Sequence, residues 1–160
     1  MIMMKSPSLV RIILCDYPSF LLFVIPVLAV CAYVFGTVFG YLPDLRLIAT
    51  GERTIAAPDS LSLVAALAVA ISLPLLARRV RLIFETFGSG RSVEGVIESV
   101  SFIKDRGRIE YSYEFNAQSY RSGNAVMKNK RTKRFSQGHP VTVYVNASEP
   151  TQAFLQELYL

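Results

Sequence analysis

Hydrophobic and polar positions divide the chain into two parts of different character. Charged side chains are absent from residues 17–43 and again from residues 60–77, whereas apolar and polar residues alternate after Gly90. The apolar part of the first stretch, residues 20–42, would form a helix of roughly 34 Å, which exceeds the bilayer core of about 30 Å. The second stretch would extend roughly 25 Å over residues 61–77. The pattern predicts a membrane α-helical hairpin followed by a small all-β domain.

Each helix of this hairpin has an alternative interpretation. The second helix is short unless residues 80–84 continue it into the interface, with Arg78, Arg79 and Arg81 extending their guanidinium groups to the lipid headgroups. A buried or re-entrant helix is the alternative there. The first helix could be a signal peptide, but such a peptide has an apolar region of only about 7–15 residues that ends in small side chains. The first segment is longer and ends in bulky residues, so we expect no cleavage.

The basic residues that flank the helices predict the orientation of the hairpin. Six of them lie on the side of the two termini: Lys5, Arg11, Arg78, Arg79, Arg81 and Arg91. Only Arg46 and Arg53 lie between the helices. Because flanking Lys and Arg stay in the cytoplasm, we expect both termini and the β-domain to be cytoplasmic. We expect a multi-pass protein that is located in a bacterial inner (plasma) membrane.

These patterns divide the chain into six segments. In order, they are an N-terminal cytoplasmic or interfacial segment (1–18), transmembrane helix 1 (19–42), an extracytoplasmic loop (43–60), transmembrane helix 2 with a juxtamembrane extension (61–87), a linker (88–91) and the cytoplasmic β-domain (92–160). Residues 9–14 predict a short interfacial helix that ends before Pro18, and a flexible terminus is the alternative. The Gly-Ser-Gly sequence at residues 88–90 is typical of a flexible boundary.

Small residues predict how the two helices pack. Gly36 and Gly40 form a G-x-x-x-G pair near the outer end of the first helix. Ser62, Ala66 and Ala70 form a stripe with the same spacing near the outer end of the second. Small residues at this spacing let helix backbones approach closely in a bilayer. In an antiparallel hairpin the two stripes can meet, and the alternative is a homodimer or a partner helix that uses the same groove.

Alternation with a period of two identifies the strands of the β-domain. Residues 109–115 place Ile, Tyr, Tyr and Phe on one face and polar residues on the other. A turn at residues 104–107 pairs this strand with an earlier one at residues 93–103, where the pattern is mixed and Gly95 suggests a bulge. Further strands are expected around Tyr120, at residues 141–145 and from Ala153 onward. About five short strands predict a small barrel or sandwich.

Several features of the β-domain follow one another in a fixed order. They are Gly95-Val96, the strand with Tyr111, Tyr113 and Phe115, the turn and aromatic from Asn116 to Tyr120, Gly138 with Val141 and Val143, and Pro150 with Ala153 and Leu155. This order resembles a bacterial family catalogued as domain of unknown function 3592, over about residues 92–158. Two positions depart from the family pattern, since Ala117 stands where Gly is common and Val145-Asn146-Ala147 stands where Tyr-x-Pro is common. The resemblance implies membrane helices attached to a small β-domain, without an established enzymatic role or transferable binding residues.

Residue types that support catalysis or metal binding are scarce. His139 is the only histidine, and Cys15 and Cys31 both lie in or beside the first helix, so no histidine cluster can form within the chain. Glu110 and Glu114 share the polar face of one strand, and solvation explains them. We therefore expect no catalytic residue, no metal site and no cofactor.

Five cations gather within seven residues, a segment that we call the basic loop: Lys128, Lys130, Arg131, Lys133 and Arg134. A solvated loop is the plainest interpretation. The functional alternatives are attraction to anionic lipid headgroups, at about 1 kcal/mol per basic residue, and an acidic protein partner. Nucleic acid is not expected as a partner, because residues 91–160 carry ten basic residues against seven acidic ones and lack a broad basic face with stacking aromatics.

The function predicted from these patterns is that of a non-enzymatic, membrane-anchored interaction module. It would serve as an accessory subunit or scaffold of a membrane protein assembly, with membrane lipid and another membrane protein or a second copy of the chain as partners. One alternative is a sensor or binder of anionic lipid at the inner leaflet through residues 128–134. A second alternative is a membrane-bound enzyme of unknown type.

Overall fold

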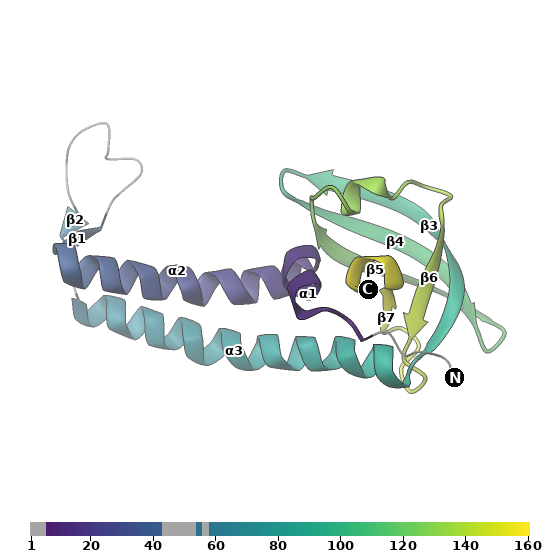
Figure 1. Cartoon of the computed structure of the whole chain (residues 1–160), viewed down its shortest axis with the longest axis horizontal. Helices are drawn as coiled ribbons and strands as arrows, with labels where there is room; N and C mark the ends of the chain where they lie inside the picture. Colours follow the sequence, from purple (N-terminus) through teal and green to yellow (C-terminus); the bar gives the residue numbers. More distant parts are fainter. Residues whose placement is uncertain (1–5, 43–53, 56–57) are drawn as a thin grey trace. The chain divides into compact units, whose positions relative to one another are not determined.

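The computed structural model describes residues 6–42, 54–55 and 58–160. The chain forms two compact units (Figure 1). One, which we call the domain unit, contains Met1–Phe20 and Ala77–Leu160, and the other, the helical unit, contains Leu21–Leu76. Two long helices, α2 (Tyr17–Phe39) and α3 (Pro58–Ser89), each contribute residues to both units.

The helical unit consists mainly of α2 and α3, with two-residue strands β1 (Tyr41–Leu42) and β2 (Thr54–Ile55) that pair antiparallel. Both helices are long and apolar enough to cross a membrane, and 11% of the residues in the most apolar window of each are buried. The core helix of a soluble protein would be mostly buried, whereas most of the apolar surface of these two helices is not covered by the described residues. The predicted pair of long apolar helices is confirmed. Most of the loop expected at residues 43–60 lies outside the described residues.

The small residues that are buried in the helical unit differ from the predicted ones. Gly36 is buried as expected, and Ala65 and Ser72 are buried on α3. The remaining predicted residues are exposed: Gly40, Ser62, Ala66 and Ala70. A step of four residues advances about 40° around a helix, so such a stripe drifts off any one face, whereas seven residues return to within about 20°. The buried face of α3 is therefore the one that contains Ala65 and Ser72, and not the predicted stripe. That a partner helix binds the exposed stripe remains a prediction.

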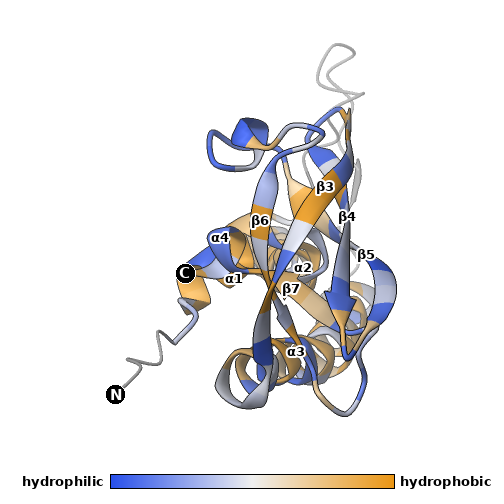
Figure 2. Ribbon diagram, turned by 90° about the vertical axis from the view of Figure 1, so that its right-hand side faces the viewer, coloured by the Kyte–Doolittle hydropathy of each residue, from blue (hydrophilic) through white to orange (hydrophobic). Residues whose placement is uncertain are grey.

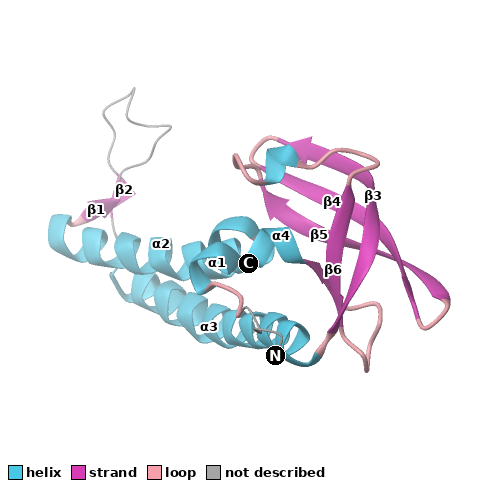
Figure 3. Ribbon diagram, turned by 45° about the vertical axis from the view of Figure 1, so that its right-hand side comes forward, coloured by secondary structure: helices cyan, strands magenta, loops and turns pink. Residues whose placement is uncertain are grey.

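The β-domain is a five-stranded antiparallel sheet that is nearly closed into a barrel (Figures 1 and 3). Its strands follow the order β5-β4-β3-β6-β7. They are β3 (Arg91–Ile103), β4 (Arg106–Phe115), β5 (Gln118–Met127), β6 (Pro140–Val145) and β7 (Ala153–Leu155). The predicted small β-domain with five strands is confirmed, as a barrel-like sheet.

A bulge in β3 explains why its sequence pattern is mixed. The register against β4 shifts between Ile97 and Ser99, so Glu98 is the extra residue. Before the bulge, the odd-numbered residues Gly95 and Ile97 face the interior of the sheet. After it, the even-numbered residues do. Figure 2 shows the changes in hydropathy along this strand. The expected bulge at Gly95 is corrected. Glycine is needed there for space, because a Cβ would lie 2.8 Å from Val143 Cγ2.

A buried asparagine links β5 to β7. The Asn124 Oδ1 atom accepts a hydrogen bond from Leu155 N at 3.3 Å, and Nδ2 donates to Ala153 O at 3.3 Å. The Tyr111 hydroxyl donates to the same carbonyl at 2.7 Å. The side-chain amide of Asn124 thus pairs with backbone groups of β7 as a neighbouring strand would. Without it, these groups would be unsatisfied at a buried sheet edge.

Segments from both ends of the chain complete the core of the domain unit. The short helices α1 (Leu9–Cys15) and α4 (Gln156–Tyr159) contribute Ile12, Leu158 and Tyr159, all fully buried. Near its end, α3 contributes Ile83 and Phe87. The predicted short helix before Pro18 is present as α1, but it packs into the domain core on one face.

The linker expected at residues 88–91 is almost absent. Helix α3 continues to Ser89 and β3 begins at Arg91, which leaves only Gly90 between them. A Cβ on Gly90 would lie 2.2 Å from Thr86 O and 2.7 Å from Val145 O. The expected flexible boundary is therefore corrected to a tight helix-to-strand junction that only glycine fits.

Candidate functional site

Asp16 lies at the junction of α1 and α2 and is fully buried. Its Oδ2 atom accepts hydrogen bonds from Ser19 N at 3.1 Å and from Ser19 Oγ at 2.6 Å. This is the geometry of a helix N-cap, in which a carboxylate satisfies a free backbone N–H of the first turn and interacts favourably with the helix dipole. Asp16 therefore starts α2.

The same carboxylate forms a partly buried ion pair with α3. Arg79 donates through Nη2 to Oδ1 at 2.9 Å and through Nε to Oδ2 at 3.2 Å, and the Tyr159 hydroxyl donates to Oδ1 at 3.0 Å. Burial raises the pKa of Tyr159 well above its ordinary value, so this hydroxyl remains a donor. Arg79 therefore binds Asp16 within the protein, and the prediction that it extends to the lipid headgroups is wrong. With five donors the carboxylate is saturated, and the cluster fastens α1, α2, α3 and α4 together.

The sequence carried a signal for this cluster. Asp16 followed by Pro18 and Ser19 is a helix-start pattern, with Asp at the cap and Pro in the first turn. In an antiparallel hairpin a charge at the start of the first helix lies level with one just beyond the uncharged stretch of the second, which is where Arg79 stands. The contribution of Tyr159 could not be found in this way, because it depends on the fold of the domain.

The basic loop is an ordered part of the domain unit. Lys128, Lys130, Lys133 and Arg134 are exposed, as predicted. Arg131 is partly used within the fold, because its Nη1 atom donates to Glu157 O at 3.1 Å. The loop contains a single turn of 3-10 helix, η1 (Thr132–Arg134).

Two side chains hold the loop in place. The Asn129 Oδ1 atom accepts from the backbone N–H groups of Arg131 and Thr132, each at 2.9 Å. The buried Thr132 hydroxyl donates to Met127 O at 2.7 Å. Asn129 Nδ2 also donates to Leu14 O at 3.2 Å, which joins the loop to the end of α1. The structure thus brings together the expected interfacial helix and the expected basic loop, which the sequence treated as separate features.

A hollow of about 470 Å³ lies between α1 and the basic loop. It is lined by Arg11, Leu14, Cys15, Asn129, Lys130 and Arg131. Three of these residues are cations and none is acidic. On α1, the apolar side chains of Leu9, Val10 and Leu14 are between 53% and 65% exposed. An apolar face therefore lies next to a positively charged one.

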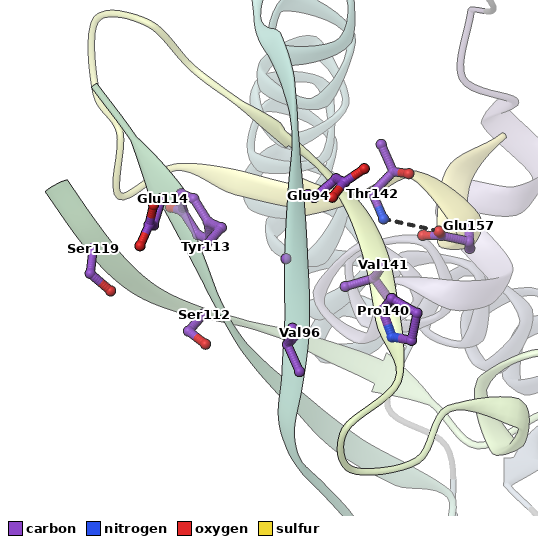
Figure 4. Close-up of a pocket in the computed structure, with 11 residues that line it drawn as sticks. Glu94, Val96, Ser112, Tyr113, Glu114, Ser119, Pro140, Val141, Thr142 and Glu157 are labelled. Carbon is purple, nitrogen blue, oxygen red and sulfur yellow. Dashed lines mark hydrogen bonds between the residues drawn. The ribbon is translucent and has the colours of Figure 1, made fainter. Parts of the chain in front are cut away.

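A second hollow, of about 560 Å³, lies over strands β3, β4 and β6 (Figure 4). Glu94, Glu114 and Glu157 are among its lining residues, and Glu157 Oε1 accepts from Thr142 N at 3.1 Å. Burial raises the pKa of Tyr113, which also lines it, to about 12. Among the described residues, no three His, Cys, Asp or Glu side chains are grouped so that they could hold a metal ion.

A network of exposed ion pairs covers another part of the sheet surface. Arg121 pairs with Glu98 at 2.7 Å and with Glu110 at 3.0 Å, and Arg108 pairs with Glu110 at 3.2 Å. A hydrogen bond from Ser99, and then the two arginines, lower the pKa of Glu110. Glu110 is therefore part of a paired cluster, whereas solvation alone was expected.

The fold and these surfaces define the class of the protein as a small barrel-like β-domain joined to two long apolar helices. Comparison with known families agrees with this description: residues 89–158 match the family model of the Domain of unknown function (DUF3592). The predicted resemblance is confirmed over that segment. No curated protein and no solved structure matches the chain.

Proposed function

We propose that the chain is a two-pass membrane protein whose β-domain lies on the cytoplasmic side of the membrane as a non-catalytic interaction module. The observation that carries the proposal is the exposed apolar surface of the two long helices. Leu28 and Val38 on α2 and Leu63 and Ile71 on α3 are between 59% and 69% exposed. Such a surface favours lipid over water at about 25 cal/mol per Å².

Rigid attachment supports the role of a scaffold more than that of a tethered catalyst. The Asp16–Arg79 ion pair and the tight junction at Gly90 both limit rotation of the β-domain about the end of α3. The β-domain and the end of α3 therefore belong to one compact unit. Preorganisation of that kind lowers the entropic cost of association.

The excess of basic residues beside the helix ends on the side of the termini supports a cytoplasmic β-domain. The exposed small residues Ser62, Ala66 and Ala70 on α3 would then be available to a helix of another membrane protein. The partner in this proposal is a membrane protein that contributes such a helix.

Affinity purification of the full chain from native membranes in mild detergent, followed by mass spectrometry, tests this role. A stoichiometric membrane partner is expected. The matched variant Ala66→Leu places a large side chain on the exposed stripe and should reduce recovery of that partner. Val64→Ala changes an exposed residue about 160° away around the same helix and should not. Recovery of the protein alone would contradict the scaffold.

A further inference from the structure

We propose that the hollow between α1 and the basic loop binds the phosphate of an anionic phospholipid headgroup. The inference rests on the proposed function, because it requires that α2 be inserted in a bilayer. It adds to that function a lipid site built from two parts of the chain that are more than 110 residues apart.

The charges around the hollow suit a phosphate. Arg11 approaches from α1, and Lys130 and Arg131 approach from the loop, so cations face the space from both sides. No acidic side chain is among the lining residues. Asp16 is buried and paired with Arg79, and neither Asp16 nor Glu157 lines the hollow. The hollow therefore has an uncompensated positive charge.

The apolar side chains beside the hollow suit the lipid more than a free anion. Leu9, Val10 and Leu14 are more than half exposed, although α1 buries Ile12 and Cys15 on its other face. A helix with an apolar outer face and flanking cations is typical of one that lies in the membrane interface. Acyl chains would cover these side chains while the headgroup occupies the hollow.

The position of the hollow along the chain places it at the depth of the headgroups. Helix α1 ends at Cys15 and the membrane-spanning candidate α2 begins at Tyr17. Only one residue separates the two helices, so a bilayer around α2 brings its headgroups to α1. The lipid would come from the same leaflet that surrounds the start of α2.

The site is preorganised rather than formed by a flexible tail. Asn129 links the loop to α1 through Leu14 O, and Thr132 fixes the loop to the end of β5 through Met127 O. The backbone that carries Lys130 is therefore held in place before a lipid arrives. Binding then orders little more than the ends of the cationic side chains.

Hydrogen exchange of the full-length protein in nanodiscs tests the inference. One set of discs contains phosphatidylcholine alone and the other contains phosphatidylglycerol in addition. We expect the amides of residues 9–15 and 128–131 to exchange about tenfold more slowly in the anionic discs, since two or more cations lie at the surface. The double variant Arg11→Gln with Lys130→Gln should lose this difference.

The matched control is the double variant Lys128→Gln with Lys133→Gln. It removes the same charge from the same loop, at exposed positions outside the lining of the hollow. It should keep most of the difference between the discs. Equal exchange in both kinds of disc, or equal loss in both double variants, would overturn the site. Failure of the wild-type protein to enter nanodiscs would instead contradict the proposed function.

Discussion

At the scale of single residues, the Asp16 carboxylate has the most consequences for the fold. It caps α2, pairs with Arg79 on α3 and accepts from Tyr159 near the C-terminal end of the chain. A buried charge is tolerated only when it is paired and hydrogen-bonded. The five donors around Asp16 meet that condition and turn a costly group into a link between four helices.

Replacing this carboxylate should destabilise the domain unit. Asp16→Asn removes the partner of a guanidinium that is 29% exposed, and the cost should be about 2–3 kcal/mol, below that of breaking a fully buried pair. Thermal unfolding of the full chain in detergent measures the effect. Glu85→Gln, which breaks the exposed pair with Arg81, is the control and should leave the midpoint unchanged. Equal effects of the two changes would contradict the role of Asp16.

A second prediction concerns the turn between β4 and β5. Asn116 and Ala117 both have positive φ, at 53° and 61°, as a type I′ turn requires. Glycine accepts this conformation without the steric cost of a Cβ, so Ala117→Gly should stabilise the fold by about 0.5–1 kcal/mol after the entropy of the unfolded chain is deducted.

The control for this prediction is Ala125→Gly within β5, where the same change should destabilise by about 0.5–1 kcal/mol. Denaturant unfolding followed by circular dichroism measures both variants. Loss of stability in Ala117→Gly would show that the turn does not carry the strain that its φ angles indicate.

At the scale of elements, alternation of apolar residues was sufficient to find the strands but not their irregularities. The four apolar positions of residues 109–115 are all buried in β4, and the three polar positions between them are not. The bulge at Glu98 was missed, because a change of phase in β3 looks like a weak pattern until its partner strand is known. The junction at Gly90 was missed because glycine is typical both of flexible linkers and of close backbone contacts.

Closure of the sheet gives a prediction at this scale. Asn124→Ala leaves the N–H of Leu155 and the carbonyl of Ala153 with fewer partners between β5 and β7, and it should cost about 1–3 kcal/mol. Hydrogen exchange shows where the loss occurs. The amide of Leu155 should exchange faster, while amides of the β3–β4 pair should change only with global stability. Uniform acceleration across the sheet would contradict a local role for Asn124.

At the scale of the whole molecule, the sequence predicted the division into apolar helices and a β-domain but not the extent of the domain unit. Residues 1–18 were expected as a separate segment, yet α1 supplies Ile12 to the core and bonds to the basic loop. This contact joins segments more than 110 residues apart, and no local pattern encodes it. The candidate lipid site could not be predicted for the same reason, since Arg11 and Lys130 meet only in the fold.

The most direct test of the account is the membrane topology of the full chain. Cys15 and Cys31 are replaced by Ala, and single cysteines are introduced by Glu52→Cys between the helices and by Gln137→Cys on the exposed side of the β-domain. Intact cells are then treated with a maleimide that does not cross membranes. We expect Glu52→Cys to be labelled from outside and Gln137→Cys to be labelled only after permeabilisation. Labelling of both positions from outside, or recovery of the protein in the soluble fraction, would contradict a membrane hairpin with a cytoplasmic β-domain.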